Sequence, residues 1–216
     1  MDKIAHIFVE TIIKWWKNEK RWFPWRYTEE PYFILVTEVL LRKTTAKQVN
    51  SLYNEFFTEY PTFKSLSCAN RDKLKKLIAP LGLSNQRSGQ LIKLSKVILE
   101  EHGGKVPSDY SKLLNLPGVG RYAAGAVMCQ CYMQDEAMVD RNVIRVIGRY
   151  FNFKSDKKDP STDLKLWDFT KYLIPIGKCK EFNLGVMDFA NAICRAKNPK
   201  CSECLLSEFC EYNQEN

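Results

Sequence analysis

Apolar residues recur every three to four positions along most of the chain, which is the spacing that places them on one face of an α-helix. No segment alternates between apolar and polar residues for long enough to predict a strand. Gly and Pro residues such as Pro61 and Gly103-Gly104 separate the helical segments. The expected helices are Ile4–Lys17, Tyr32–Thr44, Ala46–Tyr60, Asn70–Ile78, Gln86–His102, Tyr110–Asn115, Tyr122–Gln130, Arg141–Phe151, Leu164–Ile174 and Phe182–Cys194. The pattern therefore predicts an all-α fold.

The character of the helical segments changes along the chain and predicts two domains. Residues 22–130 form a run of short helices, whereas residues 131–216 contain longer helices and then a cysteine-rich tail. A chain of 216 residues can bury one large core or two small ones. We expect a helical domain of residues 22–130 to be inserted into a second, discontinuous domain made of residues 1–21 and 131–216.

The net charge of the chain indicates a class of partner. The chain has 33 Lys and Arg residues against 25 Asp and Glu residues, a net charge of +8. A positive surplus attracts polyanions, because neutralised phosphates release their counterions, and it favours nucleic acid over a membrane. Charge alone does not distinguish this from a soluble basic protein without such a partner. No segment resembles a signal peptide or a membrane span, so we expect a monomer in the cytoplasm of a prokaryote, associated with the nucleoid.

Four of the eight cysteines lie in the tail with the spacing Cys194-x6-Cys201-x2-Cys204-x5-Cys210. Disulfides are not expected in a reducing compartment, whereas four thiolates this close together can surround a metal centre. Soft sulfur ligands select zinc or an iron–sulfur cluster. Structural zinc sites usually contain two Cys-x2-Cys pairs and this tail contains one. The spacing favours a cluster and leaves zinc as the alternative.

The segment Leu116-Pro117-Gly118-Val119-Gly120 separates two expected helices. Its glycines permit backbone torsions that other residues avoid, so exposed amides can converge on one phosphate oxygen. The other interpretation is a tight helix–helix turn without a ligand. Because a helix of small residues follows, the segment is typical of a DNA-binding helix-hairpin-helix. The residues expected to contact DNA are Gly118, Val119, Gly120 and Arg121.

Glu38 lies in Phe33–Leu41, where apolar residues occupy every side of the expected helix. A carboxyl group in a buried helix is costly unless it is used, and burial should raise its pKa. A raised pKa suits a general acid. A structural glutamate with satisfied hydrogen bonds is the alternative.

Together, the hairpin, the Val139-Asp140 pair that opens a helix and the cysteine tail resemble the iron–sulfur branch of the helix-hairpin-helix base-excision DNA glycosylases. That branch includes endonuclease III and the adenine glycosylases, and the resemblance covers about residues 22–210. It implies a six-helix barrel domain with the hairpin, a discontinuous cluster domain, and double-stranded DNA in a cleft between them. It also implies a [4Fe–4S] cluster on the four tail cysteines.

The resemblance gives Asp140 and Glu38 catalytic roles. Asp140 matches the family's catalytic aspartate by motif position, although on its own it reads as a helix N-cap. The two interpretations are compatible, because cleavage of an N-glycosidic bond builds positive charge on the sugar, which a fixed anion stabilises. Glu38 would protonate the departing base or position the water.

Tyr122 occupies the position at which the bifunctional relatives carry a lysine nucleophile. A phenol cannot form an imine, so we expect no lyase step. The combination of Glu38, Tyr122 and Asp140 resembles the archaeal thymine-DNA glycosylases that act on T·G mismatches. The resemblance assigns further DNA contacts, which fill the gap left by a flipped base, to Arg42, Lys43, Leu83, Ser84, Asn85, Gln86 and Arg87. Without the resemblance, the pattern of these residues is typical of a solvated helix end and a polar turn.

The sequence therefore predicts a monofunctional DNA glycosylase that releases thymine or uracil paired with guanine. One alternative is an adenine glycosylase acting opposite 8-oxoguanine, which Glu38 favours and Tyr122 opposes. A second alternative is a non-catalytic DNA-binding module, and the presence of both Glu38 and Asp140 argues against it.

Overall fold

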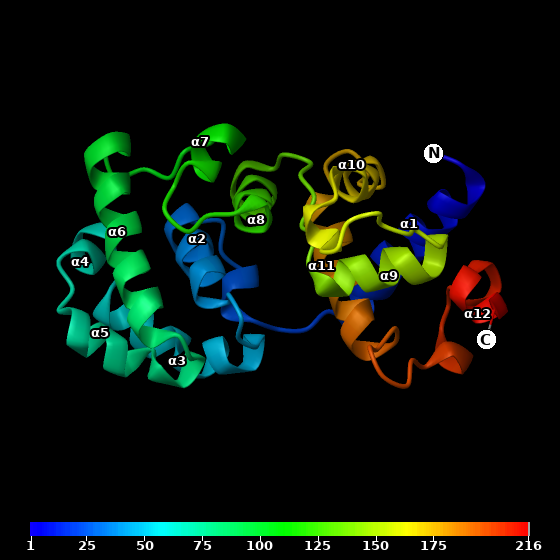
Figure 1. Cartoon of the computed structure of the whole chain (residues 1–216), viewed down its shortest axis with the longest axis horizontal. Helices are drawn as coiled ribbons and strands as arrows, with labels where there is room; N and C mark the ends of the chain where they lie inside the picture. Colours follow the sequence, from blue (N-terminus) through cyan, green and yellow to red (C-terminus); the bar gives the residue numbers. More distant parts are fainter. Residues whose placement is uncertain (216) are drawn as a thin grey trace. The chain divides into compact units, whose positions relative to one another are not determined.

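The computed structural model describes residues 1–215, and within that range it contains α-helices and short 3-10 helices but no strand (Figure 1). The all-α prediction is confirmed. The chain divides into two compact units. The central unit is Trp22–Tyr132, and the terminal unit combines Met1–Arg21 with the segment that begins at Met133. None of the described helices has the length and apolar composition needed to span a membrane.

Helix α2 lies at the core of the central unit. It is apolar around its circumference, and every residue from Ile34 to Leu40 is buried. It packs against α8 and α6, and α6 in turn packs against α4 and α5. The helices of this unit are η1 Pro24–Arg26, α2 Pro31–Leu40, α3 Ala46–Glu59, α4 Phe63–Ser67, α5 Arg71–Leu77, η2 Ala79–Leu81, α6 Ser84–His102, α7 Tyr110–Leu114 and α8 Arg121–Tyr132.

Two local features of this unit differ from the sequence prediction. The helix expected to continue to Thr44 ends at Leu40, and Lys43 adopts the left-handed conformation with φ of 52°, which a continuing helix cannot contain. Helix α4 was not predicted, because its five residues form little more than one turn and give no detectable period. Helix α4 begins at a capping box formed by Thr62 and Ser65.

The terminal unit joins helices from both ends of the chain, and α11 contacts both α1 and α9. The ring of Phe8 packs against the rings of Tyr150, Phe151 and Phe182, with centroids 4.9, 5.1 and 6.3 Å away. The helices of this unit are α1 Lys3–Glu19, α9 Arg141–Phe151, η3 Pro160–Thr162, α10 Leu164–Tyr172, α11 Cys179–Ala192, η4 Cys201–Glu203, η5 Ser207–Phe209 and α12 Glu211–Glu215.

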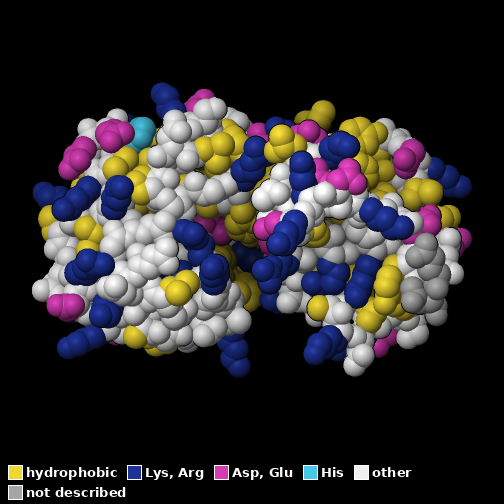
Figure 2. All heavy atoms as spheres, in the orientation of Figure 1, with side chains coloured by type: hydrophobic (Ala, Val, Ile, Leu, Met, Phe, Trp, Pro, Cys, Tyr) yellow, Lys and Arg dark blue, Asp and Glu magenta, His cyan; other side chains and the backbone are white. Residues whose placement is uncertain are grey.

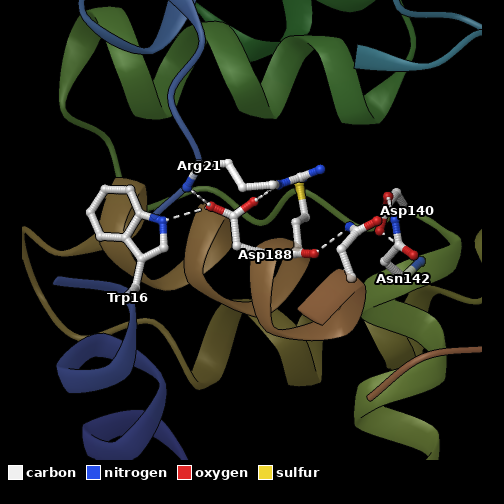
Figure 3. A network of polar contacts seen from close by, with 7 residues as sticks. Trp16, Arg21, Asp140, Asn142 and Asp188 are labelled. Carbon is white, nitrogen blue, oxygen red and sulfur yellow. Dashed lines mark hydrogen bonds and ion pairs between the residues drawn. The ribbon is translucent and has the colours of Figure 1, made fainter. Parts of the chain in front are cut away.

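The contact between α1 and α11 depends on a glycine and a buried aspartate. A Cβ atom at Gly185 would lie 2.8 Å from Cγ2 of Ile12, so only glycine allows this approach of the two helices. Asp188 is 1% exposed and accepts hydrogen bonds from Trp16 Nε1 at 3.1 Å and from Arg21 Nε at 2.6 Å (Figure 3). These bonds satisfy the buried carboxylate and fix the chain where it leaves α1.

Candidate active site and metal centre

Glu38 projects from the buried helix α2. Its exposed fraction is 5%, and its neighbour Thr37 is fully buried. The prediction that this carboxyl group lies within a buried helix is therefore confirmed. Pro31 at the first helical position begins α2, since its missing N–H needs no partner there.

The hairpin connects α7 to α8 through a tight turn in the central unit. Gly118 has φ of 79°, and the Val119 amide donates to the Leu116 carbonyl at 3.1 Å. Gly120 and Arg121 are exposed at the start of α8. Val119 is 6% exposed, so its side chain is buried within the turn. Tyr122, the second residue of α8, is half-buried.

The two hairpin glycines make different demands on the fold, and this gives a matched test. A Cβ atom on Gly118 would lie 1.9 Å from Gln90 Nε2, and a left-handed alanine costs about 1 kcal/mol as well. A Cβ atom on Gly120 meets nothing within 4 Å. We expect Gly118→Ala to lower the melting temperature and to weaken binding to undamaged duplex at least threefold. Gly120→Ala should melt like the wild type, and equal melting of both variants would contradict this account.

Six residues line one pocket beside the hairpin: Arg42, Lys43, Leu83, Gln86, Arg87 and Gln90. We call this the α2–α6 pocket. Arg42 connects it to the hairpin, because its Nη1 donates to Gln90 Oε1 at 2.9 Å and to the Gly118 carbonyl at 3.5 Å. Leu83 is 53% exposed at the edge of this pocket. The structure thus brings the two segments expected to contact DNA together with the hairpin.

Arg87 differs from the rest of this group. Its side chain is 3% exposed, and its guanidinium donates to backbone carbonyls, among them Val39 at 2.6 Å and Arg42 at 2.8 Å. From the sequence, Arg87 was expected to contact DNA. Its burial leaves the side chain unable to reach DNA in this structure. Ser84 is half-buried, whereas Asn85 and Gln86 are exposed.

Asp140 is the N-cap of α9. Its Oδ1 accepts hydrogen bonds from the backbone amides of Asn142 and Val143, both at 2.8 Å. Its Oδ2 accepts from Asn142 Nδ2 at 2.8 Å (Figure 3). The residue is half-buried. Three N–H donors therefore fix the orientation of this carboxylate.

Two residues that the sequence analysis did not identify support Asp140. Arg145 Nη2 donates to Asn142 Oδ1 at 3.1 Å and to the Ala190 carbonyl at 3.0 Å. Arg145 Nε donates to the Cys194 carbonyl at 2.9 Å. A continuous set of hydrogen bonds thus runs from Asp140 through Asn142 and Arg145 to the first tail cysteine. The spacing of Asn142 and Arg145, three residues apart on α9, was the available signal.

Cys194, Cys201, Cys204 and Cys210 line one pocket, and none of them forms a disulfide. Within the described residues, no group of three or more His, Cys, Asp or Glu side chains is gathered around a position for one metal ion. An iron–sulfur cluster distributes its four thiolates over the irons, so its cysteines need only surround a shared cavity. This arrangement fits a cluster.

Arg149 of α9 holds the beginning of the cysteine segment. Its Nη1 lies 3.6 Å from the Cys194 Sγ and donates to the Arg195 carbonyl at 2.6 Å. Its Nη2 donates to the Ala196 carbonyl at 3.2 Å, and the guanidinium stacks over the Tyr212 ring at 4.6 Å. These contacts fix the start of the cysteine segment and place a positive charge beside the cysteine pocket.

Burial raises the pKa of the Cys204 thiol to about 11, and it also raises the pKa of the Cys210 thiol. A thiol with a pKa this high is protonated at neutral pH. Ligation therefore releases protons, because only the thiolate binds metal.

Figure 2 shows Lys and Arg side chains on the surface of each unit. With the net charge of +8, this distribution suits a polyanionic ligand.

Comparison with known proteins decides the family. Residues 36–171 match the HhH-GPD superfamily of base excision DNA repair proteins. The chain belongs to this superfamily. Residues 194–210 match the iron-sulfur binding domain of endonuclease III, the segment that contains the four cysteines described above. The cofactor of this superfamily member is a [4Fe–4S] cluster, and Cys194, Cys201, Cys204 and Cys210 are the residues that would hold it.

The chain is similar to two archaeal proteins along nearly its whole length. It is 43% identical to the thymine/uracil-DNA glycosylase of Methanothermobacter thermautotrophicus, covering 98% of this chain and 95% of the relative. It is also 43% identical to the thymine-DNA glycosylase of Aeropyrum pernix, covering 93% and 92%. A solved structure of a thermostable thymine-DNA glycosylase matches it with a TM-score of 0.94, 43% identity and coverage of 99% and 98%.

Proposed function

We propose that this protein is a DNA glycosylase that hydrolyses the N-glycosidic bond of thymine or uracil paired with guanine. The observation that carries the proposal is the fixed Asp140 carboxylate at the start of α9, in a superfamily member whose full-length archaeal relatives are thymine/uracil-DNA glycosylases. The double-stranded DNA of the chromosome is the partner, which would place the enzyme at the nucleoid.

Asp140 would stabilise the transition state. As the bond between C1′ and the base nitrogen breaks, positive charge develops on the sugar, and a fixed anion beside it lowers the barrier. The hydrogen bonds from Asn142 and Val143 keep the carboxylate oriented before the reaction starts. Water then forms the new C1′–O bond, and its proton balances the departing base anion. The products are the free base and an abasic site.

Glu38 would protonate the departing base or orient the water, which its burial in α2 suits. We expect Glu38→Gln to fold normally and to lower the single-turnover rate by roughly two orders of magnitude, because general acid–base catalysis contributes about that much. Single-turnover assays on a T·G duplex measure this loss, with Thr37→Ser as the control at the adjacent buried position. A wild-type rate would leave Glu38 a structural residue.

The DNA backbone would be bound by the hairpin. Amides at Gly118 and Gly120 and the charge of Arg121 suit a phosphate oxygen. Arg42, Lys43, Leu83 and the exposed polar residues at the start of α6 would contact the bases beside the flipped nucleotide. Leu83 is large, apolar and exposed, which suits a side chain that fills the emptied position.

The reaction should leave the strand intact. By the resemblance to the bifunctional glycosylases, Tyr122 occupies the position of their lysine amine, and a phenol forms no Schiff base with the sugar. We expect abasic product that is cleaved only after alkali treatment, and no borohydride-trapped protein–DNA complex. Spontaneous nicking by the purified enzyme, or a trapped complex, would contradict the monofunctional assignment.

A panel of duplexes tests the substrate. We expect release of thymine from T·G and uracil from U·G, little release from T·A, and none from A·8-oxoguanine. A wobble pair is easier to open than a Watson–Crick pair, so discrimination begins with the cost of flipping. Uracil lacks only the methyl group of thymine, and this difference is worth about 1–3 kcal/mol.

The panel distinguishes a protein that releases no base from an enzyme that releases a different base. The wild type and Asp140→Asn are assayed on every duplex at enzyme excess. Release of adenine without attack on T·G would replace the proposal with an adenine glycosylase. Binding to all duplexes without release of any base would indicate a DNA-binding module.

A further inference from the structure

The buried side chain of Arg87 contacts the backbone of two separate segments of the central unit. Its Nη1 donates to the carbonyls of Val39 at 2.6 Å and Leu40 at 2.9 Å. Helix α2 ends at Leu40, so these are carbonyls for which the helix supplies no donor of its own. Arg87 therefore caps the helix that carries Glu38.

The second guanidinium nitrogen acts on two turns. Nη2 donates to the Arg42 carbonyl at 2.8 Å and to the Gly82 carbonyl at 3.4 Å. The residues that follow these carbonyls, Lys43 and Leu83, both have the left-handed conformation, with φ of 52° and 51°. A left-handed conformation costs a non-glycine residue about 1 kcal/mol. One nitrogen thus fixes the peptide unit directly before each strained residue.

We infer that Arg87 is a positioning residue that holds Lys43 and Leu83 in the geometry in which they meet DNA. The inference rests on the proposed function, in which both side chains contact the bases beside a flipped nucleotide. Opening a base pair costs a few kcal/mol, and a side chain on a loose turn loses part of its binding energy to its own ordering. A turn that is already fixed avoids that loss.

The chemistry of arginine is needed for this arrangement. Its planar fork offers several donors in fixed directions, and it reaches the end of α2 and both turns at once. A lysine has one amine on a flexible stem and cannot replace the fork, although it keeps the charge. Arg87→Lys therefore removes the geometry and retains the charge.

A base-flipping assay tests the inference. The T·G duplex carries 2-aminopurine next to the target thymine, so its fluorescence rises when the pair is unstacked. We expect Arg87→Lys to reduce the fluorescence amplitude and to lower the single-turnover rate at least tenfold. Binding to undamaged duplex through the hairpin should change less than twofold. A merely structural role would lower the melting temperature and would leave the fluorescence amplitude of the folded protein unchanged.

Arg71→Lys is the matched control. Arg71 also donates to the backbone at the start of α6, to the Asn85 carbonyl at 3.2 Å, but it contacts neither strained turn. The Arg71→Lys protein should flip the target base and release it as the wild type does. In a double-mutant cycle, the fold loss in single-turnover rate of the Arg87→Lys, Leu83→Ala double variant should be smaller than the product of the two separate fold losses. The reason is that Arg87 acts through Leu83. Fully independent losses, or normal flipping in folded Arg87→Lys, would overturn the inference.

A second variant covers the case in which Arg87→Lys does not fold. Gly82 has φ of 73°, and a Cβ atom there meets nothing within 4 Å, so Gly82→Ala strains the turn without a clash. Gly82→Ala should reduce the fluorescence amplitude that reports base flipping while the protein remains folded. A wild-type amplitude would count against the inference. A wild type inactive on T·G and U·G would refute the proposed function itself. An active wild type with normal Arg87→Lys and Gly82→Ala proteins would refute only the role of Arg87.

Discussion

Asp140→Asn should lower the single-turnover rate on a T·G duplex by roughly two to three orders of magnitude, the usual effect of removing one electrostatic contact to a transition state. The substitution keeps an oxygen that can accept from the amides of Asn142 and Val143, so the N-cap and the helix persist. It removes the negative charge that would face the sugar. Binding to the mismatch should therefore remain within a fewfold of the wild type.

Asp2→Asn provides the control for this experiment. Asp2 caps α1 in the same unit and accepts from the Ala5 amide at 2.7 Å, but it has no proposed part in catalysis. Its rate should be unchanged. If Asp140→Asn retained wild-type turnover, Asp140 would be reduced to a cap, and the proposed stabilisation of the sugar cation would be wrong.

Cys204→Ala should abolish the cluster. We expect the broad absorbance near 400 nm, roughly where thiolate-bound iron–sulfur centres absorb, to disappear. When bound, the cluster joins four positions of the tail, and its loss should lower the melting temperature by roughly 10 °C or more. Iron analysis of the wild type should give about four irons per chain.

Cys68→Ala is the control for the cluster experiment. Cys68 is an exposed free cysteine in the central unit, so its replacement should leave absorbance, iron content and melting unchanged. A colourless wild-type protein that contained a single zinc ion would contradict the cluster assignment. Retained absorbance in Cys204→Ala would remove that residue from the ligand set.

Features that depend on local periodicity and short spacings could be predicted from the sequence. The apolar circumference of α2 predicted the burial of Glu38, and that prediction is confirmed. The position of Asp140 before an apolar period predicted its N-cap, and the structure has that cap. In both cases the interactions lie within one helix or its first turn, so adjacent residues contain the information.

Features that depend on distant backbone groups could not be predicted in this way. The sequence around Arg87 is typical of a polar surface residue. The carbonyls that its side chain binds lie more than forty positions away, on α2. Arg145 was not identified as a support for Asp140, since its carbonyl partners, Ala190 and Cys194, belong to α11 and the tail. Every residue has a backbone carbonyl, so the sequence does not indicate which carbonyls an arginine binds. Arginines that bind carbonyls are therefore recognised only once the fold is known.

The pairing of α1 with α11 has a consequence for the order of folding during synthesis. The central unit is continuous in sequence, so its residues can associate as soon as they leave the ribosome. Helix α1 is made first but finds its partner, including Gly185 and Asp188, only when α11 has emerged. At about 5–20 residues per second, the nascent chain then exposes the apolar face of α1, with Phe8, for roughly ten seconds or longer. This first helix is the part of the nascent chain that we expect a chaperone to bind.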